Sequence, residues 1–154
     1  MTELTFSDSI SVSVPPDELY ALVSDVTRTG EWSPICKACW WDEGGGGPQV
    51  GAWFTGRNET PERTWETRSQ VVAAEPGRKF AWQVNNGWVH WEYAFEPEGD
   101  GTRLTESWEF LPAGIAGFHD RYGAEADAQI EQRSEAARSG IPATLAAIKK
   151  AVES

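Results

Sequence analysis

The chain has 154 residues, a length that suits one domain built around one core. Its 24 acidic and 13 basic residues give a formal net charge of -11, which argues against a nucleic-acid partner because phosphate binding requires a basic surface. No apolar run approaches the roughly 20 residues needed to span a bilayer, and the first residues do not resemble a signal peptide. We therefore expect a single cytoplasmic domain over residues 1–154, without integral membrane association.

Tryptophan is unusually frequent in this chain. There are nine Trp residues, and all of them lie between positions 32 and 108. Each Trp brings a large apolar surface and one N–H donor. They either fill the core of a sheet or line a pocket with aromatic planes, and both alternatives place the aromatic wall in the central part of the chain.

The chain begins with a predicted strand and one or two short helices. Residues 4–14 alternate apolar and polar side chains, which is typical of a half-buried antiparallel strand. Asp8 interrupts the apolar face, so we expect it near an open end or paired. Pro15 and Pro16 end the strand and favour a helix that continues to about Arg28. A second short helix is expected near residues 29–32.

Six further strands are predicted between residues 35 and 110. Turn signals such as Asn85-Asn86-Gly87 separate most of them and indicate hairpins, which form an antiparallel sheet. The glycine-rich residues 43–51 favour a flexible hairpin loop over a phosphate-binding loop, because neither a Lys-Ser/Thr pair nor a helix follows. The predicted strands are residues 35–42, 52–59, 63–73, 79–84, 88–96 and 102–110.

After Pro112 the composition changes to Ala, Glu, Gln and Arg, with apolar residues at helical spacing. Gly140 and Pro142 interrupt this pattern, so we expect a kink there or two helical segments. The fold class is therefore α+β: a curved antiparallel sheet of about seven strands around a long C-terminal helix. A sheet that closes over a single helix leaves room for an internal cavity.

Local motifs in this order resemble the SRPBCC superfamily, the helix-grip fold of START-like lipid-transfer domains, birch-pollen-type allergens and polyketide cyclases. The similarity is greatest to the bacterial branch labelled polyketide cyclase/dehydrase and lipid transport. The resemblance implies a helix-grip fold, but this fold hosts many functions and so does not define an activity. The matching segments are Asp25-Val-Thr-Arg28, Glu31-Trp32-Ser33-Pro34, Gly51-Ala-Trp-Phe54-Thr-Gly56-Arg-Asn58, Trp65-Glu-Thr67, Glu75-Pro-Gly-Arg78, Phe80-Ala-Trp82 and Gly101-Thr-Arg-Leu104-Thr-Glu106-Ser-Trp108.

Strand parity assigns side chains to the two faces of the sheet. Arg57 is better placed in water, so its neighbours of opposite parity point inward. The same argument leaves Trp88 and His90 outside. The residues expected to bind a ligand are Phe54, Asn58, Trp65, Thr67, Phe80, Trp82, Trp91, Tyr93, Glu106 and Trp108.

Glu106 is the charged residue of this inward set, between Leu104 and Trp108 on the apolar face. Burial of a carboxylate is costly and is expected to raise its pKa. Glu106 could bond to Asn58, Thr67, Tyr93 or a buried water, or it could anchor a ligand hydroxyl. It could also act as a general acid or base, with Tyr93 as a second candidate. We favour the structural and anchoring roles over catalysis.

Cys36 and Cys39 form a C-x-x-C pattern, but neither metal nor redox chemistry is expected from it. The only histidines are His90 and His119, too few to complete a zinc site, and no helix follows the motif as in thioredoxin-type pairs. Positions 36 and 39 of a regular strand face opposite sides, so we interpret them as two ordinary thiols. No metal or cofactor is predicted, and His119 could lie at a pocket mouth.

Three classes of function remain open. The first is binding, with possible transport or sequestration, of a small hydrophobic molecule such as a lipid, a polyketide or an aromatic compound. The second is a cyclase or aromatase acting on a polyketide. The third is a regulatory or toxin–antitoxin-type partner, which an exposed patch of Trp41, Trp53 and Trp88 would favour. An aromatic inward face with few polar groups favours binding over catalysis, by a monomer or weak homodimer.

Overall fold

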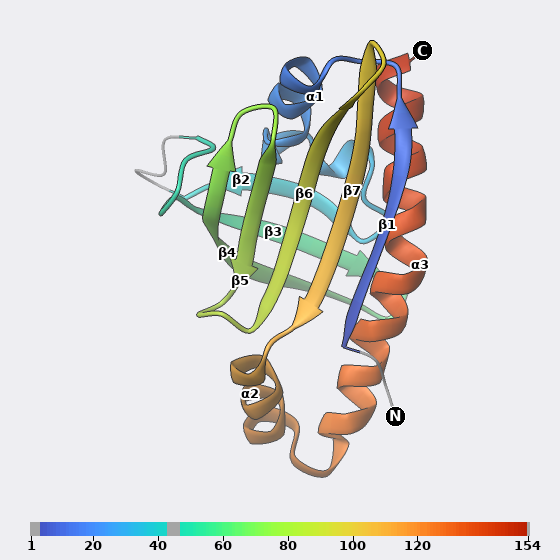
Figure 1. The fold of residues 1–154 in the computed structure, drawn as a ribbon. Coiled ribbons are helices and arrows are strands. Elements are labelled where there is room, and N and C mark those ends of the chain that lie inside the picture. Colours follow the sequence, from blue (N-terminus) through green and yellow to red (C-terminus); the bar gives the residue numbers. More distant parts are fainter. Residues whose placement is uncertain (1–3, 43–46, 154) are drawn as a thin grey trace.

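The computed structural model describes residues 4–42 and 47–153, which form one antiparallel sheet flanked by helices (Figure 1). Residues 43–46 of the predicted glycine-rich loop lie outside the described residues. The strands are β1 (Thr5–Val12), β2 (Cys36–Trp41), β3 (Trp53–Thr60), β4 (Arg63–Glu75), β5 (Lys79–Val84), β6 (Val89–Glu98) and β7 (Gly101–Phe110). The helices are α1 (Pro16–Val23), η1 (Val26–Glu31), α2 (Pro112–Tyr122), η2 (Gly123–Glu125) and α3 (Ala126–Glu153).

The sheet has the strand order β1-β7-β6-β5-β4-β3-β2, and every neighbouring pair is antiparallel. Strands β2 to β7 follow one another as neighbours, as the turn signals predict. The turn after β5 contains Asn85 with a φ of 56° and Gly87 with a φ of 81°, the left-handed conformations that Asn and Gly tolerate. α1 and η1 carry the chain from β1 at one edge to β2 at the other.

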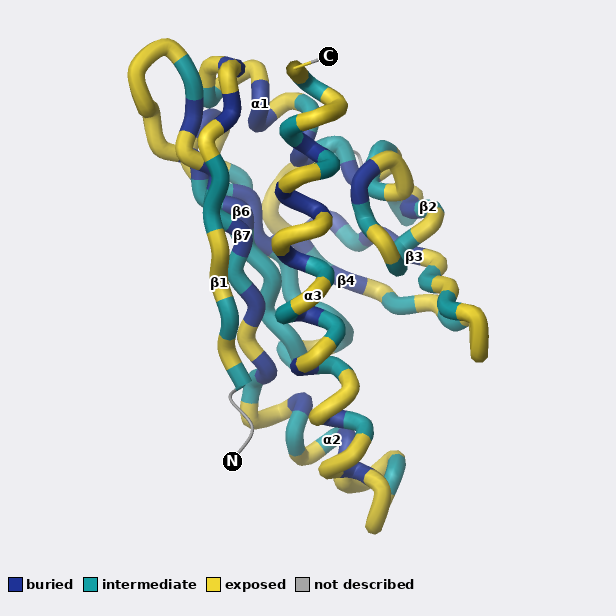
Figure 2. The backbone as a smooth tube through the Cα atoms, turned by 90° about the vertical axis from the view of Figure 1, so that its right-hand side faces the viewer, coloured by how far each residue is buried: buried dark blue, intermediate teal, exposed yellow. Residues whose placement is uncertain are grey.

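The sheet curves around α3, which confirms the predicted helix-grip arrangement. In Figure 2, β1, β6 and β7 lie on one side of α3 and β2 and β3 on the other. The buried residues of α3 recur at helical spacing and form an inward face that is mostly apolar, with Ser134 and Thr144 as its buried polar residues. Its buried apolar residues are Ala126, Ile130, Ala137, Ile141, Leu145 and Ile148.

The C-terminal helical region breaks at a different place from the one predicted. α3 continues through Gly140 and Pro142, and the break falls at Gly123, between α2 and α3. Gly123 has a φ of 55°, a conformation that favours glycine and ends α2. Pro142 removes one helical hydrogen bond, but Ile141 and Leu145 beside it are buried and hold the helix on the sheet.

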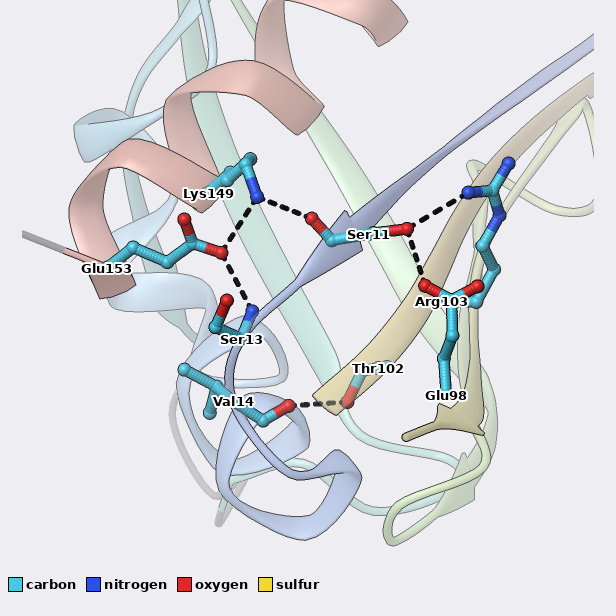
Figure 3. Close-up of polar contacts among 8 residues, drawn as sticks. All are labelled: Ser11, Ser13, Val14, Glu98, Thr102, Arg103, Lys149 and Glu153. Carbon is cyan, nitrogen blue, oxygen red and sulfur yellow. Dashed lines mark hydrogen bonds and ion pairs between the residues drawn. The ribbon is translucent and has the colours of Figure 1, made fainter. Parts of the chain in front are cut away.

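Polar contacts fasten the last turn of α3 to the edge strand β1 (Figure 3). Lys149 Nζ donates to the Ser11 carbonyl at 2.7 Å and to the Glu153 carboxylate at 2.8 Å. The same carboxylate accepts a bond from the Ser13 backbone N–H at 2.7 Å. These contacts hold the C-terminal end of α3 against the end of β1. Within the described residues, no helix has the length and apolar character needed to cross a membrane.

Candidate functional site

A cavity of about 390 Å³ lies between the concave face of the sheet, α3 and η1. The ten residues that the sequence analysis expects to bind a ligand all line this cavity. α3 supplies the opposite wall, including Ala137, Ile141 and Thr144. The ten sheet residues are Phe54, Asn58, Trp65, Thr67, Phe80, Trp82, Trp91, Tyr93, Glu106 and Trp108.

A row of three tryptophans forms the floor of the cavity. Trp82 pairs with Trp91 in the β5–β6 register, and Trp91 pairs with Trp108 in the β6–β7 register. The Trp82 and Trp91 rings are stacked, with 6.3 Å between centroids and 12° between planes. Phe54 meets the edge of Trp82 at 6.1 Å. Side chains directly opposite on neighbouring strands lie close together, so the register itself builds a continuous aromatic surface.

Trp88 lies on the cavity side, not outside as predicted. It precedes β6, so the alternation of that strand does not fix its direction. Two glycines of α2 make room for it: a Cβ on Gly114 would lie 2.2 Å from the Trp88 carbonyl oxygen, and one on Gly117 would lie 2.3 Å from its ring. The ring also meets Phe118 at 6.0 Å. Trp88 therefore joins α2 to the rim of the cavity.

Glu106 is buried, with 4% of its surface exposed, and it borders the cavity. It lies opposite Tyr93 in the β6–β7 register and hydrogen-bonds to it. Burial raises the pKa of Glu106 to about 8, although the bond with Tyr93 acts in the opposite direction. Glu106 Oε1 has no hydrogen-bond partner among the described residues. The carboxyl group therefore presents a free polar atom in an aromatic environment.

The other predicted partners of Glu106 bond to each other instead. Asn58 Nδ2 donates to Thr67 Oγ1 at 3.2 Å, on the neighbouring strands β3 and β4. Burial raises the pKa of Tyr93, and the adjacent Glu106 carboxylate adds to the increase. The cavity therefore has two separate polar spots, an amide–hydroxyl pair on one wall and a carboxyl–phenol pair on the other.

Cys36 and Cys39 lie on the same side of β2, contrary to the prediction that they face opposite sides. The register of β2 with β3 shifts between Cys36 and Ala38, which marks a β-bulge. The extra residue restores the two sulfurs to one face, where their Sγ atoms are 3.1 Å apart and border the cavity. The six residues of β2 contain no glycine or other turn residue that would mark a bulge, so sequence alone could not reveal this pair.

Three arginines gather at the rim near α2 and α3, although the net charge of the chain is -11. The Arg63 guanidinium lies 4.3 Å from the Trp65 ring centroid, and that of Arg121 lies 5.3 Å from the Trp88 ring. Arg133 lies over Trp65 at 5.9 Å. Burial lowers the pKa of Arg133, and the nearby charge of Arg63 acts in the same direction. Sequence reasoning missed these residues because they come from separate elements.

Other candidates lie away from the cavity. His119 pairs with Asp127 at 3.5 Å and is not among the lining residues. Trp41 and Trp53 are half-buried, and Trp41 packs on Phe54 at 5.6 Å. With Trp88, they do not form the exposed patch that would favour a regulatory partner. In the described parts of the chain, no three His, Cys, Asp or Glu residues are grouped as metal ligands.

Comparison with known proteins defines the family of this fold and cavity. The family described as polyketide cyclase/dehydrase and lipid transport matches residues 3–152. A polyketide cyclase-like protein from Corynebacterium glutamicum, solved by NMR, is 59% identical over 97% of this chain and 91% of its own, with a TM-score of 0.70. Among curated proteins, no significant match was found.

Two more distant structures share the fold alone. The KanY protein is 20% identical with complete coverage of both chains (100% each) and a TM-score of 0.69. StfQ, the di-domain ARO/CYC protein of the steffimycin biosynthetic pathway, is 17% identical with a TM-score of 0.67; the alignment covers 96% of this chain and 49% of StfQ. Since the family match spans nearly the whole sequence, this chain belongs to the polyketide cyclase/dehydrase and lipid transport family and has its SRPBCC helix-grip fold.

Proposed function

We propose that the protein binds a small, mostly apolar ring compound in the cavity and that Glu106 holds one polar group of it. The observation that carries this proposal is the unpartnered Oε1 of a buried carboxyl group at an aromatic wall. Ligand pockets are typically apolar with a few polar groups that fix orientation. A volume of about 390 Å³ is within the range of small-molecule sites.

The protonation state of Glu106 determines which ligand group it can accept. With a pKa of about 8, the carboxyl group is mostly neutral at pH 7 and can donate one hydrogen bond and accept another. A neutral carboxyl group next to the Tyr93 hydroxyl suits a ligand hydroxyl or carbonyl. It disfavours a carboxylate at the same position, because that charge would be buried without a counter-charge. The arginines at the rim offer a place for an anionic end of a longer ligand.

Native mass spectrometry of freshly purified protein tests whether the cavity is occupied. We expect a reproducible excess mass over the chain alone, which disappears under denaturing conditions and gives the mass of the bound compound. The apo mass alone, from several expression hosts and lipid-rich extracts, would contradict a tightly bound ligand.

Calorimetric titration with naphthalene and 2-naphthol tests the anchor. The two probes share an apolar ring system, but only 2-naphthol has a hydroxyl group. We expect Glu106→Leu, which has no hydrogen-bonding atom at this position, to weaken 2-naphthol binding by roughly threefold to tenfold, the value of one net hydrogen bond, and not to weaken naphthalene binding. Glu109→Leu is the matched control, since Glu109 is an exposed residue of the same strand. Equal losses for both probes would contradict the anchoring role.

A polyketide cyclase or aromatase is the second candidate function. It is favoured by the Tyr93–Glu106 contact, a buried pair of proton-exchanging groups at the ring-lined wall, and by the likeness to StfQ, whose name includes ARO/CYC. Incubation with a thioester of a linear poly-β-ketone would distinguish the two functions. Faster cyclisation than in buffer, lost in Tyr93→Phe, would indicate an enzyme; binding without turnover would indicate a carrier.

A further inference from the structure

The two sulfur atoms of β2 are placed for chemistry with each other. Cys36 Sγ and Cys39 Sγ are 3.1 Å apart, and a disulfide bond requires about 2.05 Å, so they need to approach by only about 1 Å. Gly56 lies opposite Cys39 on β3, where a Cβ would be 3.2 Å from both sulfurs. The missing side chain at Gly56 therefore leaves the space that the sulfur pair occupies.

The two thiols differ in acidity. The hydrogen bond from Cys36 lowers the pKa of Cys39; burial opposes this effect, and a hydrogen bond from Thr29 adds to the lowering. The same contact, with burial and the adjacent Cys39, raises the pKa of Cys36. In a redox-active C-x-x-C pair, the more acidic cysteine reacts as a thiolate with the oxidant and becomes a sulfenic acid. The second cysteine, which keeps its proton, then reacts with that sulfenic acid to form the disulfide.

The pair is also reachable from the cavity. Cys39 is buried with 9% of its surface exposed and Cys36 is partly exposed, yet both line the cavity wall. A small oxidant that enters the cavity therefore meets both sulfurs, whereas a bulky protein thiol is excluded. This favours an intramolecular reaction over cross-linking between two chains.

We propose that Cys36 and Cys39 form an oxidisable dithiol site in the cavity wall, which hydrogen peroxide converts to an intramolecular disulfide. The Cys39 thiolate attacks the peroxide: an S–O bond forms, the O–O bond breaks, and the leaving hydroxide takes up a proton as water. The Cys36 sulfur then attacks the sulfenic sulfur, so that the S–S bond forms, the S–O bond breaks and a second water leaves. Two thiols lose two electrons and two protons, and one peroxide is reduced to two waters.

Tryptic mapping of the oxidised protein tests this site directly. Cleavage after Arg28, Lys37 and Arg57 separates Cys36, in peptide 29–37, from Cys39, in peptide 38–57. The folded, reduced protein is treated with hydrogen peroxide, its remaining thiols are alkylated, and it is digested without reductant. We expect the two peptides to remain joined, the protein to run as a monomer on a non-reducing gel, and dithiothreitol to release both peptides.

Two controls make the result specific. Cys39→Ser should slow the loss of thiol at least about tenfold, whereas Cys36→Ser should leave Cys39 reactive but convert it to sulfinic acid. Wild-type protein unfolded in urea is a second control that requires no substitution. In urea, the joined peptides should form at least about fivefold more slowly than in the folded protein. Separately alkylated peptides, disulfide-linked dimers, or equal rates in the folded and unfolded protein would overturn the proposal. These outcomes do not depend on the ligand, so the cavity proposal stands or fails separately.

Discussion

Glu106 is a carboxyl group whose native surroundings favour its neutral form. Its pKa is about 8 in the folded protein and about 4.5 for the ordinary side chain. The folded state therefore keeps a proton that the unfolded chain releases between these two values. Because the folded state binds more protons over this interval, stability falls as the pH rises from about 4.5 to 8. This residue lowers stability at neutral pH, and strongly shifted pKa values of this kind are found most often at functional sites.

The pH dependence of unfolding gives the corresponding prediction. We expect the free energy of unfolding of the wild type to fall by about 4 kcal/mol between pH 5 and pH 8.5 through this group. Glu106→Gln should remove that fall, so the variant gains stability relative to the wild type at the higher pH. Urea denaturation at both pH values is the measurement, and Glu109→Gln should keep the wild-type slope. Parallel pH profiles for Glu106→Gln and the wild type would contradict the buried carboxyl group.

Substitution of two helical glycines, Gly117 and Gly140, by Ala is expected to change the stability of the protein in opposite directions. A Cβ on Gly117 of α2 would overlap the Trp88 ring, so Gly117→Ala should destabilise the protein by about 1–3 kcal/mol. A Cβ on Gly140 of α3 would meet only Pro34 Cγ at 3.8 Å, so Gly140→Ala should stabilise it by up to about 1 kcal/mol. Thermal unfolding of the two variants checks both signs. Stabilisation by both substitutions would show that helix propensity, not the Trp88 contact, dominates at Gly117.

Most elements of this fold could be predicted, because their signals are local. The alternation of apolar and polar residues predicted the strands. It also predicted correctly that Trp82, Trp91 and Trp108 point toward one cavity. The Asn85–Gly87 turn is a strong hairpin signal, and the structure has a hairpin there. These features require only the period of a strand and the backbone freedom of turn residues.

The features that could not be predicted depend on contacts between distant elements. The bulge at Cys36 and Ala38 changes the parity of a strand, and its sequence offers no turn residue to mark it. Pro142 is a standard helix breaker, yet packing of α3 on the sheet overrides it, and Gly123 sets the break instead. Trp88 turns inward because α2, which comes about 25 residues later, has glycines facing it.

At the scale of the whole molecule, we propose that residues 1–154 unfold as one cooperative domain, since α3 and the sheet share one core. The distribution of tryptophan allows a direct test. All nine Trp lie between residues 32 and 108, so Trp fluorescence reports on the sheet, its turns and the end of η1. Circular dichroism at 222 nm, in contrast, is dominated by the helices. We expect coincident urea transitions by the two methods. A helical transition separate from the fluorescence transition would show that α3 detaches on its own.

The pairing of β1 with β7 has a consequence for synthesis on the ribosome. β1 is made before its partner β7, which begins at Gly101, and the register joins Thr5 to Glu109. At a translation rate of about 5–20 residues per second, the first strand waits at least roughly 5–20 s for that partner. Lys149, which binds the Ser11 carbonyl, emerges later still. The fold therefore depends on a pairing between strands far apart in the sequence, and the alternating strand β1 lacks its partner until β7 has been translated.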